Sequence, residues 1–140
     1  MYLLDANILI AMADPAHVHH RRVQQWFHEQ PGRGWATCPL TENAFLRILS
    51  ASSYPGSLGD PMIVRQLLTR MCAFPGHQFW PDHLTLSDAA CFPVLPASKH
   101  LTDLYLLALA ASHHGKLATL DQRIDPKLLP DGGKAYFLIP

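Results

Sequence analysis

The sequence has few of the features that would assign a protein to a function class at once. Its 140 residues carry 11 basic and 11 acidic side chains, so no overall positive field would attract nucleic acid without selection. No apolar run approaches the ~18 residues of a membrane span. A glycine-rich phosphate loop is also absent. Any nucleic-acid contact must therefore be a local patch, and no membrane partner is expected.

Cysteine is scarce as well. The three cysteines, Cys38, Cys72 and Cys91, are far apart and lack the paired spacing of a zinc or redox motif, which predicts reduced thiols in the core. The apolar start of the chain has no basic residues before it and is interrupted by Asp5 and Asn7, unlike a secretory signal. A cytoplasmic protein is the expectation.

The composition is that of a globular protein, with 49% hydrophobic and 16% charged residues. A chain of this length buries roughly two thirds of its unfolded surface when it folds as one unit. We found no internal repeat and no linker that would separate two domains. The sequence therefore predicts a single domain over residues 1–140.

Short apolar segments alternate with amphipathic or apolar helical segments along the chain. Consecutive apolar residues are typical of strands buried on both faces of a parallel sheet. The alternation predicts an α/β fold, a three-layer α/β/α sandwich with a central, mostly parallel sheet of four to five strands. Strands are expected at 2–4, 35–38, 77–80, 116–120 and 134–139, helices at 6–13, 16–30, 39–51, 60–72 and 100–113, a break at 31–34, and a loop at 81–99 with a helical turn at 86–90.

Four of the acidic residues stand in equivalent places. Asp5 and Asp121 close apolar strands, whereas Glu42 and Asp103 open helices. In a parallel sheet these positions lie at the same edge, so the four carboxylates are expected to converge. Crowded carboxylates repel one another unless a cation neutralises them. Because this set offers oxygen ligands without an accompanying Cys or His, Mg²⁺ or Mn²⁺ is expected rather than zinc.

A bound ion of this kind activates water and neutralises charge on a phosphoryl group, so hydrolysis of a phosphodiester is the natural chemistry. Asn7, Thr102 and Thr119 stand next to the acids and are expected to hydrogen-bond the carboxylates or their waters. Asn7 could instead cap the helix that follows it. For Glu42 and Asp103 a purely structural alternative remains, since acids in the first turn of a helix are stabilised by its dipole.

These acidic segments resemble those of PIN-domain ribonucleases, specifically the VapC toxins of bacterial toxin–antitoxin pairs. The resemblance is carried by residues 3–10 (LLDANILI), 41–48 (TENAFLRI), 101–110 (LTDLYLLALA) and 117–121 (LATLD), in the family's order. It implies a metal-dependent endoribonuclease, with the four acids matching the family's acidic quartet. It also implies an RNA substrate, a homodimer, and a VapB-type antitoxin that inhibits the acidic groove.

Basic side chains near this region are candidates for contacts with RNA phosphates or with the antitoxin. Arg47 matches a basic position of the family on the helix that carries Glu42, and Arg21 and Arg22 belong to the densest positive cluster of the chain. Such contacts position a nucleic acid without reading its sequence. For any single one of these residues, a solvated helix face is the favoured alternative.

Two other functions share part of this sequence pattern. A phosphatase of the haloacid-dehalogenase type also begins with a strand that ends in a nucleophilic Asp, but it needs a second Asp two residues later. Asn7 occupies that position and cannot act as a general acid. The other alternative is a non-catalytic PIN-like module that binds RNA or protein. The presence of all four acids argues against it.

Overall fold

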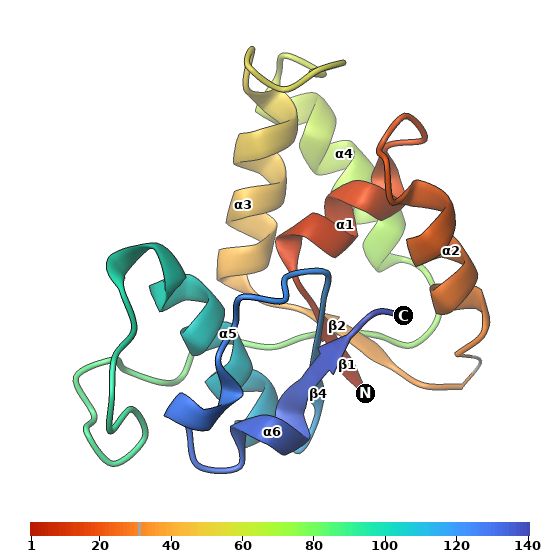
Figure 1. Ribbon diagram of the computed structural model, residues 1–140. Helices are drawn as coiled ribbons and strands as arrows, with labels where there is room; N and C mark the ends of the chain where they lie inside the picture. Colours follow the sequence, from red (N-terminus) through yellow and green to blue (C-terminus); the bar gives the residue numbers. More distant parts are fainter. Residues whose placement is uncertain (31) are drawn as a thin grey trace.

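The computed structural model describes residues 1–30 and 32–140, and it alternates strands and helices much as the sequence predicts (Figure 1). Pro31, within the predicted break, lies outside the described residues. The elements are β1 (Tyr2–Leu4), α1 (Ala6–Ala13), α2 (His20–His28), β2 (Trp35–Thr37), α3 (Pro39–Ser50), α4 (Pro61–Cys72), β3 (His77–Phe79), α5 (Leu101–Ser112), β4 (Lys116–Thr119), α6 (Gly132–Ala135) and β5 (Tyr136–Leu138), with 3₁₀ turns at Ser98–His100 and Pro126–Leu128.

The five strands of the described residues form one sheet in the order β3-β2-β1-β4-β5. All neighbouring pairs are parallel, which confirms the predicted α/β sheet. The chain builds outward from β1 to β3 on one side and then crosses to β4 and β5 on the other. The strand order therefore reverses between β1 and β4, and in such sheets ligands bind beyond the carboxyl ends of the strands at this point.

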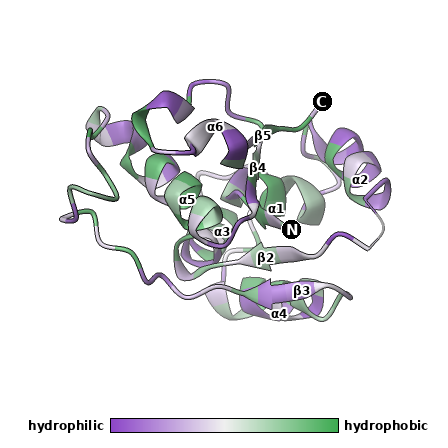
Figure 2. Ribbon diagram, turned by 90° about the horizontal axis from the view of Figure 1, so that it is seen from below, coloured by the Kyte–Doolittle hydropathy of each residue, from purple (hydrophilic) through white to green (hydrophobic). Residues whose placement is uncertain are grey.

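Helices cover both faces of the sheet, as predicted for a three-layer sandwich. Alternate residues of β1 point to opposite sides: Leu3 packs in the core under α5, whereas Tyr2 and Leu4 pack in the core formed with α1, α2, α3 and α4. All three side chains are buried because each face is covered. Figure 2 shows the hydrophilic strand β3 at the rim of the sheet, as predicted for an edge strand.

The structure departs from the predicted elements in three places. The segment predicted as a strand at 134–139 begins with the end of α6, and β5 starts at Tyr136. The predicted helical turn at 86–90 is replaced by turns in which Asp88 accepts a hydrogen bond from the backbone N–H of Ala90. The second helix begins at His20 and not at residue 16, because Asp14 holds the preceding residues in a turn through the N–H of Ala16.

Helix α6 depends on a close backbone approach that the strand prediction overlooked. A Cβ on Gly132 would lie 2.1 Å from the carbonyl oxygen of Pro126, so glycine is required where α6 packs on the second 3₁₀ turn. The cysteines follow their prediction in part: all three are free, but only Cys38 is fully buried. No helix in the described part of the chain is long and apolar enough to cross a membrane.

Candidate metal centre

Asp5 lies directly after β1, at the N-cap position of α1, where the strand order of the sheet reverses. The residue is only 7% exposed. The hydroxyl of Thr119, at the end of β4, donates a hydrogen bond to Oδ2 at 2.8 Å. Burial raises the pKa of Asp5; the Thr119 hydrogen bond opposes this, and the carboxyls of Asp103 and Asp121 raise it further. Asp5 forms no ion pair with any described residue.

Asp121 lies two residues beyond β4 and is held by its own loop. Its backbone N–H donates to Oγ1 of Thr119 at 3.0 Å, so one hydroxyl connects Asp5 and Asp121. Arg123 donates to both carboxylate oxygens of Asp121, from Nε at 2.9 Å and from Nη2 at 2.8 Å. The Arg123 hydrogen bond lowers the pKa of Asp121. Tyr136 anchors the same loop by donating to the carbonyl of Asp121 at 2.8 Å.

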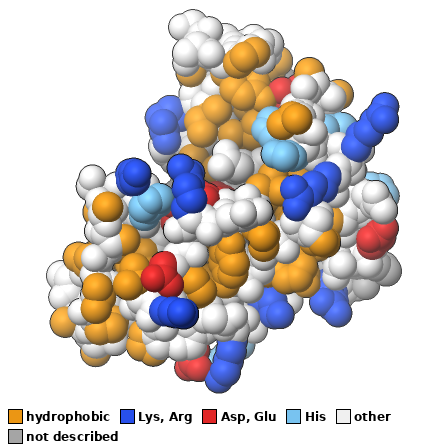
Figure 3. All heavy atoms as spheres, in the orientation of Figure 1, with side chains coloured by type: hydrophobic (Ala, Val, Ile, Leu, Met, Phe, Trp, Pro, Cys, Tyr) orange, Lys and Arg blue, Asp and Glu red, His pale blue; other side chains and the backbone are white. Residues whose placement is uncertain are grey.

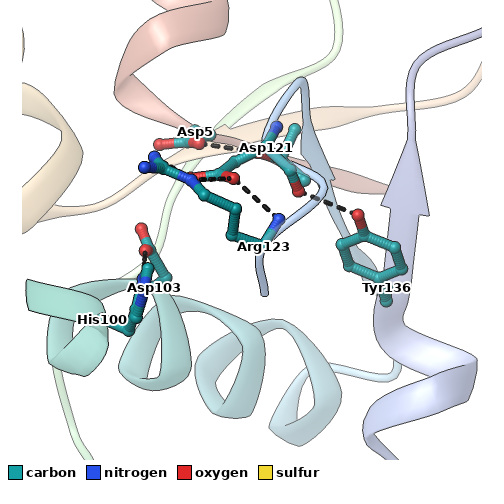
Figure 4. Close-up of polar contacts among 7 residues, drawn as sticks. Asp5, His100, Asp103, Asp121, Arg123 and Tyr136 are labelled. Atoms are coloured by element: carbon teal, nitrogen blue, oxygen red, sulfur yellow. Dashed lines mark hydrogen bonds and ion pairs between the residues drawn. The ribbon is translucent and has the colours of Figure 1, made fainter. Parts of the chain in front are cut away.

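Asp103 approaches from the first turn of α5. Its Oδ2 lies 3.5 Å from Nδ1 of His100, which forms an ion pair when the imidazole is protonated. Burial raises the pKa of Asp103, the His100 contact opposes the rise, and the carboxyl of Asp121 adds to it. Figure 4 shows Asp5, Asp103 and Asp121 turned toward a common space, with the guanidinium of Arg123 in it. We call these three residues the aspartate group.

Glu42, in the first turn of α3, contacts a different set of side chains. Its Oε1 accepts a hydrogen bond from Thr37 at 2.7 Å, and the same hydroxyl lies 2.8 Å from Nε2 of His77. Potential ligand atoms of Glu42, Cys72 and His77 all lie within 4.8 Å of one another. Among the described residues, no other group of three acidic, Cys or His side chains is as close together. We call Glu42, Cys72 and His77 the Glu42 group.

The four predicted acids thus share one edge of the sheet but do not meet at ligand distance. Each of these acids has partners of its own: Arg123 donates to Asp121, and Thr37 donates to Glu42. The expectation of an oxygen-only set was also wrong for Glu42, whose neighbours include a thiol and an imidazole.

The predicted polar neighbours of the acids differ in their surroundings. Thr119 is fully buried and bonded to Asp5. Thr102 and Asn7 are exposed, Thr102 in the first turn of α5 and Asn7 as the second residue of α1. The capping alternative for Asn7 was wrong, because Asp5 occupies the N-cap position. The amide of Asn7 is exposed to solvent in the first turn of α1, two residues after Asp5.

The three basic residues predicted to contact RNA or the antitoxin differ in their surroundings. Arg21 and Arg47 are exposed on α2 and α3. Arg22 instead donates to the backbone carbonyls of Ile139 and Pro140, at 2.6 Å for Pro140, so it fastens α2 to the end of the chain. In Figure 3 acidic atoms lie in a hollow of this face, with basic and His side chains beside it.

Arg123 and His100 are the residues of this site that the sequence analysis missed. Arg123 stands two residues after Asp121, and a carboxylate can bind both the N–H and the side chain at that spacing, as seen here. This local signal was available in the sequence. The contact of His100 with Asp103, three residues on, could be anticipated only once the helix start was known.

The aspartate group suits a hard divalent cation. A buried carboxylate without a positive partner is unfavourable, and burial raises the pKa of Asp5. Partial burial also raises the pKa of Asp103, although His100 opposes the rise. Oxygen donors from three different elements face one another, and Mg²⁺ and Mn²⁺ prefer such donors while keeping several waters. The donor set of this structure therefore fits such an ion.

Comparison with known proteins identifies the family of the chain. The sequence model of the PIN domain matches residues 2–126. Three ribonucleases of Mycobacterium tuberculosis are similar over most of their length. VapC44 is 37% identical over 136 residues (96% of this chain, 95% of the relative), VapC39 is 41% identical over 121 residues (85% and 87%), and VapC38 is 38% identical over 122 residues (86% and 85%).

The match over most of the chain makes this a PIN-domain protein, and the relatives define the branch. The chain belongs to the VapC family of PIN-domain proteins.

Proposed function

We propose that this protein is a metal-dependent endoribonuclease and the toxin of a type II toxin–antitoxin pair. The observation that carries the proposal is Asp5, a buried carboxylate without a cationic partner that faces two further carboxylates where the sheet order reverses. The ribonuclease names of the similar VapC proteins support the substrate class.

In this proposal Asp5, Asp103 and Asp121 hold Mg²⁺ or Mn²⁺, and Glu42 is the fourth acid of the site. Such an ion supplies an activated water and neutralises charge on the phosphodiester. The chain's own residues prepare the site. Thr119 orients the carboxylate of Asp5 by donating a hydrogen bond to it. Because Thr119 is buried, its hydroxyl has no water to bind instead.

Arg123 is suited to hold a phosphate of the RNA. Its guanidinium is planar and lies against Asp121, and the side chain of Arg123 is 72% exposed. A phosphate presents the same bidentate geometry as the carboxylate that it now holds. With a cation held by Asp121, the guanidinium of Arg123 would be available to a phosphate of the substrate. The exposed Arg21 and Arg47 would contact more distant phosphates.

The partners of this function are an RNA, a VapB-type antitoxin that covers the acidic groove, and a second copy of the chain. An antitoxin inhibits such a site most directly by placing a basic side chain among the aspartates, as Arg123 does within the chain. Of the alternatives, the phosphatase is disfavoured because the amide of Asn7 cannot donate a proton as a general acid. A non-catalytic module would need no buried, unpaired acid.

The test is a cleavage assay on structured RNA and on a phosphomonoester, with Mg²⁺, Mn²⁺ or EDTA. We expect RNA cleavage that needs metal and falls in Asp5→Asn by more than the ~10–100-fold typical of losing an outer-shell partner. Asp131→Asn is the matched control, because Asp131 is an exposed acid. Its backbone is in the left-handed conformation, which asparagine also adopts. RNA cleavage that survives EDTA would contradict the metal site, phosphate release would favour the phosphatase, and binding without cleavage would favour the non-catalytic module.

A further inference from the structure

The Glu42 group joins three elements on the side of the sheet that carries α3 and α4. Glu42 comes from the first turn of α3, Cys72 is the last residue of α4, and His77 begins β3 after the turn at 73–76. All three side chains are half-buried, and ligand atoms from each lie within 4.8 Å of one another. A carboxylate oxygen, a thiol sulfur and an imidazole nitrogen therefore converge from separate parts of the fold.

A buried threonine orients this group. Thr37, at the end of β2, is 0% exposed and donates to Glu42 at 2.7 Å. A hydroxyl has one proton, so the ring nitrogen of His77 at 2.8 Å donates its own N–H to Thr37. The imidazole of His77 also packs against Trp35, with the two rings tilted by 56° and their centroids 4.6 Å apart. The three side chains are thus held close together, and a metal ion would bind His77 through the ring nitrogen that carries no proton.

The chemistry of the donors selects the ion. Zinc binds Cys, His and carboxylate ligands in tetrahedral sites, and three protein ligands leave a fourth position for water. Thiolate favours borderline and soft ions over Mg²⁺, which prefers oxygen alone. The Glu42 group and the aspartate group would therefore bind different cations from the same solution.

We propose that Glu42, Cys72 and His77 form a zinc-class cation site, and that its occupation keeps the carboxylate of Glu42 away from the aspartate group. The second part rests on the proposed nuclease function, since it makes zinc an inhibitor that acts by withdrawing the fourth acid. The first part is a binding property of the chain and stands independently of any activity.

The test of the site is titration of the full-length protein with Co²⁺, a spectroscopic substitute for zinc. A thiolate bound to Co²⁺ gives a near-ultraviolet charge-transfer band that nitrogen and oxygen ligands do not give. We expect the band in the native protein, its removal by added Zn²⁺, and its loss in Cys72→Ser. His77→Gln is the second variant, expected to weaken Co²⁺ binding more than ~10-fold with the fold checked by circular dichroism. Cys91→Ser, a half-buried cysteine elsewhere, is the matched control and keeps the band.

Absence of the band from the native protein, or its persistence in Cys72→Ser, would overturn the site. Asp5→Asn separates the two proposals, because it should abolish cleavage while keeping the band. For the inhibition, the Zn²⁺ concentration that halves Mg²⁺-supported cleavage should rise at least ~10-fold in Cys72→Ser. An unchanged concentration would show that zinc acts at the aspartate group and would overturn the inhibitory part alone.

Discussion

Two acids of this protein are held in the same way but have different neighbours. Asp5 and Glu42 each accept a hydrogen bond from a buried threonine that ends a strand, Thr119 in β4 and Thr37 in β2. Asp5 faces further carboxylates, whereas Glu42 faces Cys72 and His77. The local hydrogen bond therefore fixes the position of the acid, and the surrounding side chains decide which cation it can hold.

Of the two threonines, Thr119 is expected to contribute more to stability. Thr119→Val removes the donor to Asp5 and the acceptor of the Asp121 N–H. Because Asp5 is buried, water cannot replace the lost bond, and we expect the free energy of unfolding to fall by about 1–3 kcal/mol. Urea denaturation measures this change. Thr119→Ser keeps the hydroxyl and serves as the control; an equal loss in the serine variant would attribute the effect to packing.

Asp5→Asn should change stability in the opposite direction. The folded protein raises the pKa of Asp5 above its unfolded value, so ionisation of Asp5 destabilises the fold as pH rises through the raised pKa. Asparagine does not ionise. In EDTA near pH 7 we expect the variant to be more stable by about 0.5–2 kcal/mol, as for other relieved functional sites. The added stability should vanish at a pH below the ordinary pKa of a carboxyl. Denaturation curves of the native protein and Asp5→Asn test this, and an equal difference in stability at both pH values would contradict the expectation.

Thr37→Val is expected to have the smallest effect on stability. Its partners Glu42 and His77 are half-buried, so water can replace part of what the hydroxyl gives them. We expect a loss of about 0.5–1.5 kcal/mol in urea denaturation. A loss of stability larger than that of Thr119→Val would contradict this comparison, because it would mean that water replaces the hydrogen bond of Glu42 less well than that of Asp5.

The sequence predicted the sheet well because its signals are local. Consecutive apolar residues define each short strand, and an acid at the end of a parallel strand must lie at the ligand-binding edge. For the same reason Asp5, Asp121 and Asp103 could be brought together before the structure was known.

The partners of Glu42 could not be predicted in this way. Cys72 and His77 are five residues apart, but the turn between them and the position of β3 at the rim of the sheet determine that they meet Glu42. The strand at 134–139 was placed too early because the apolar pattern does not record the contact of Gly132 with Pro126. Both features depend on tertiary packing, which a single sequence does not reveal.

In the proposed function the aspartate group holds the cation, with Asp5 as its buried ligand that forms no ion pair within the described chain. The most direct test is to measure Mn²⁺ binding to the metal-free protein, either by calorimetry or from the electron paramagnetic resonance signal of free Mn²⁺. We predict that Asp5→Asn weakens Mn²⁺ binding at least ~10-fold, whereas Asp131→Asn leaves it unchanged. Equal Mn²⁺ affinity in the native protein and Asp5→Asn would contradict the claim.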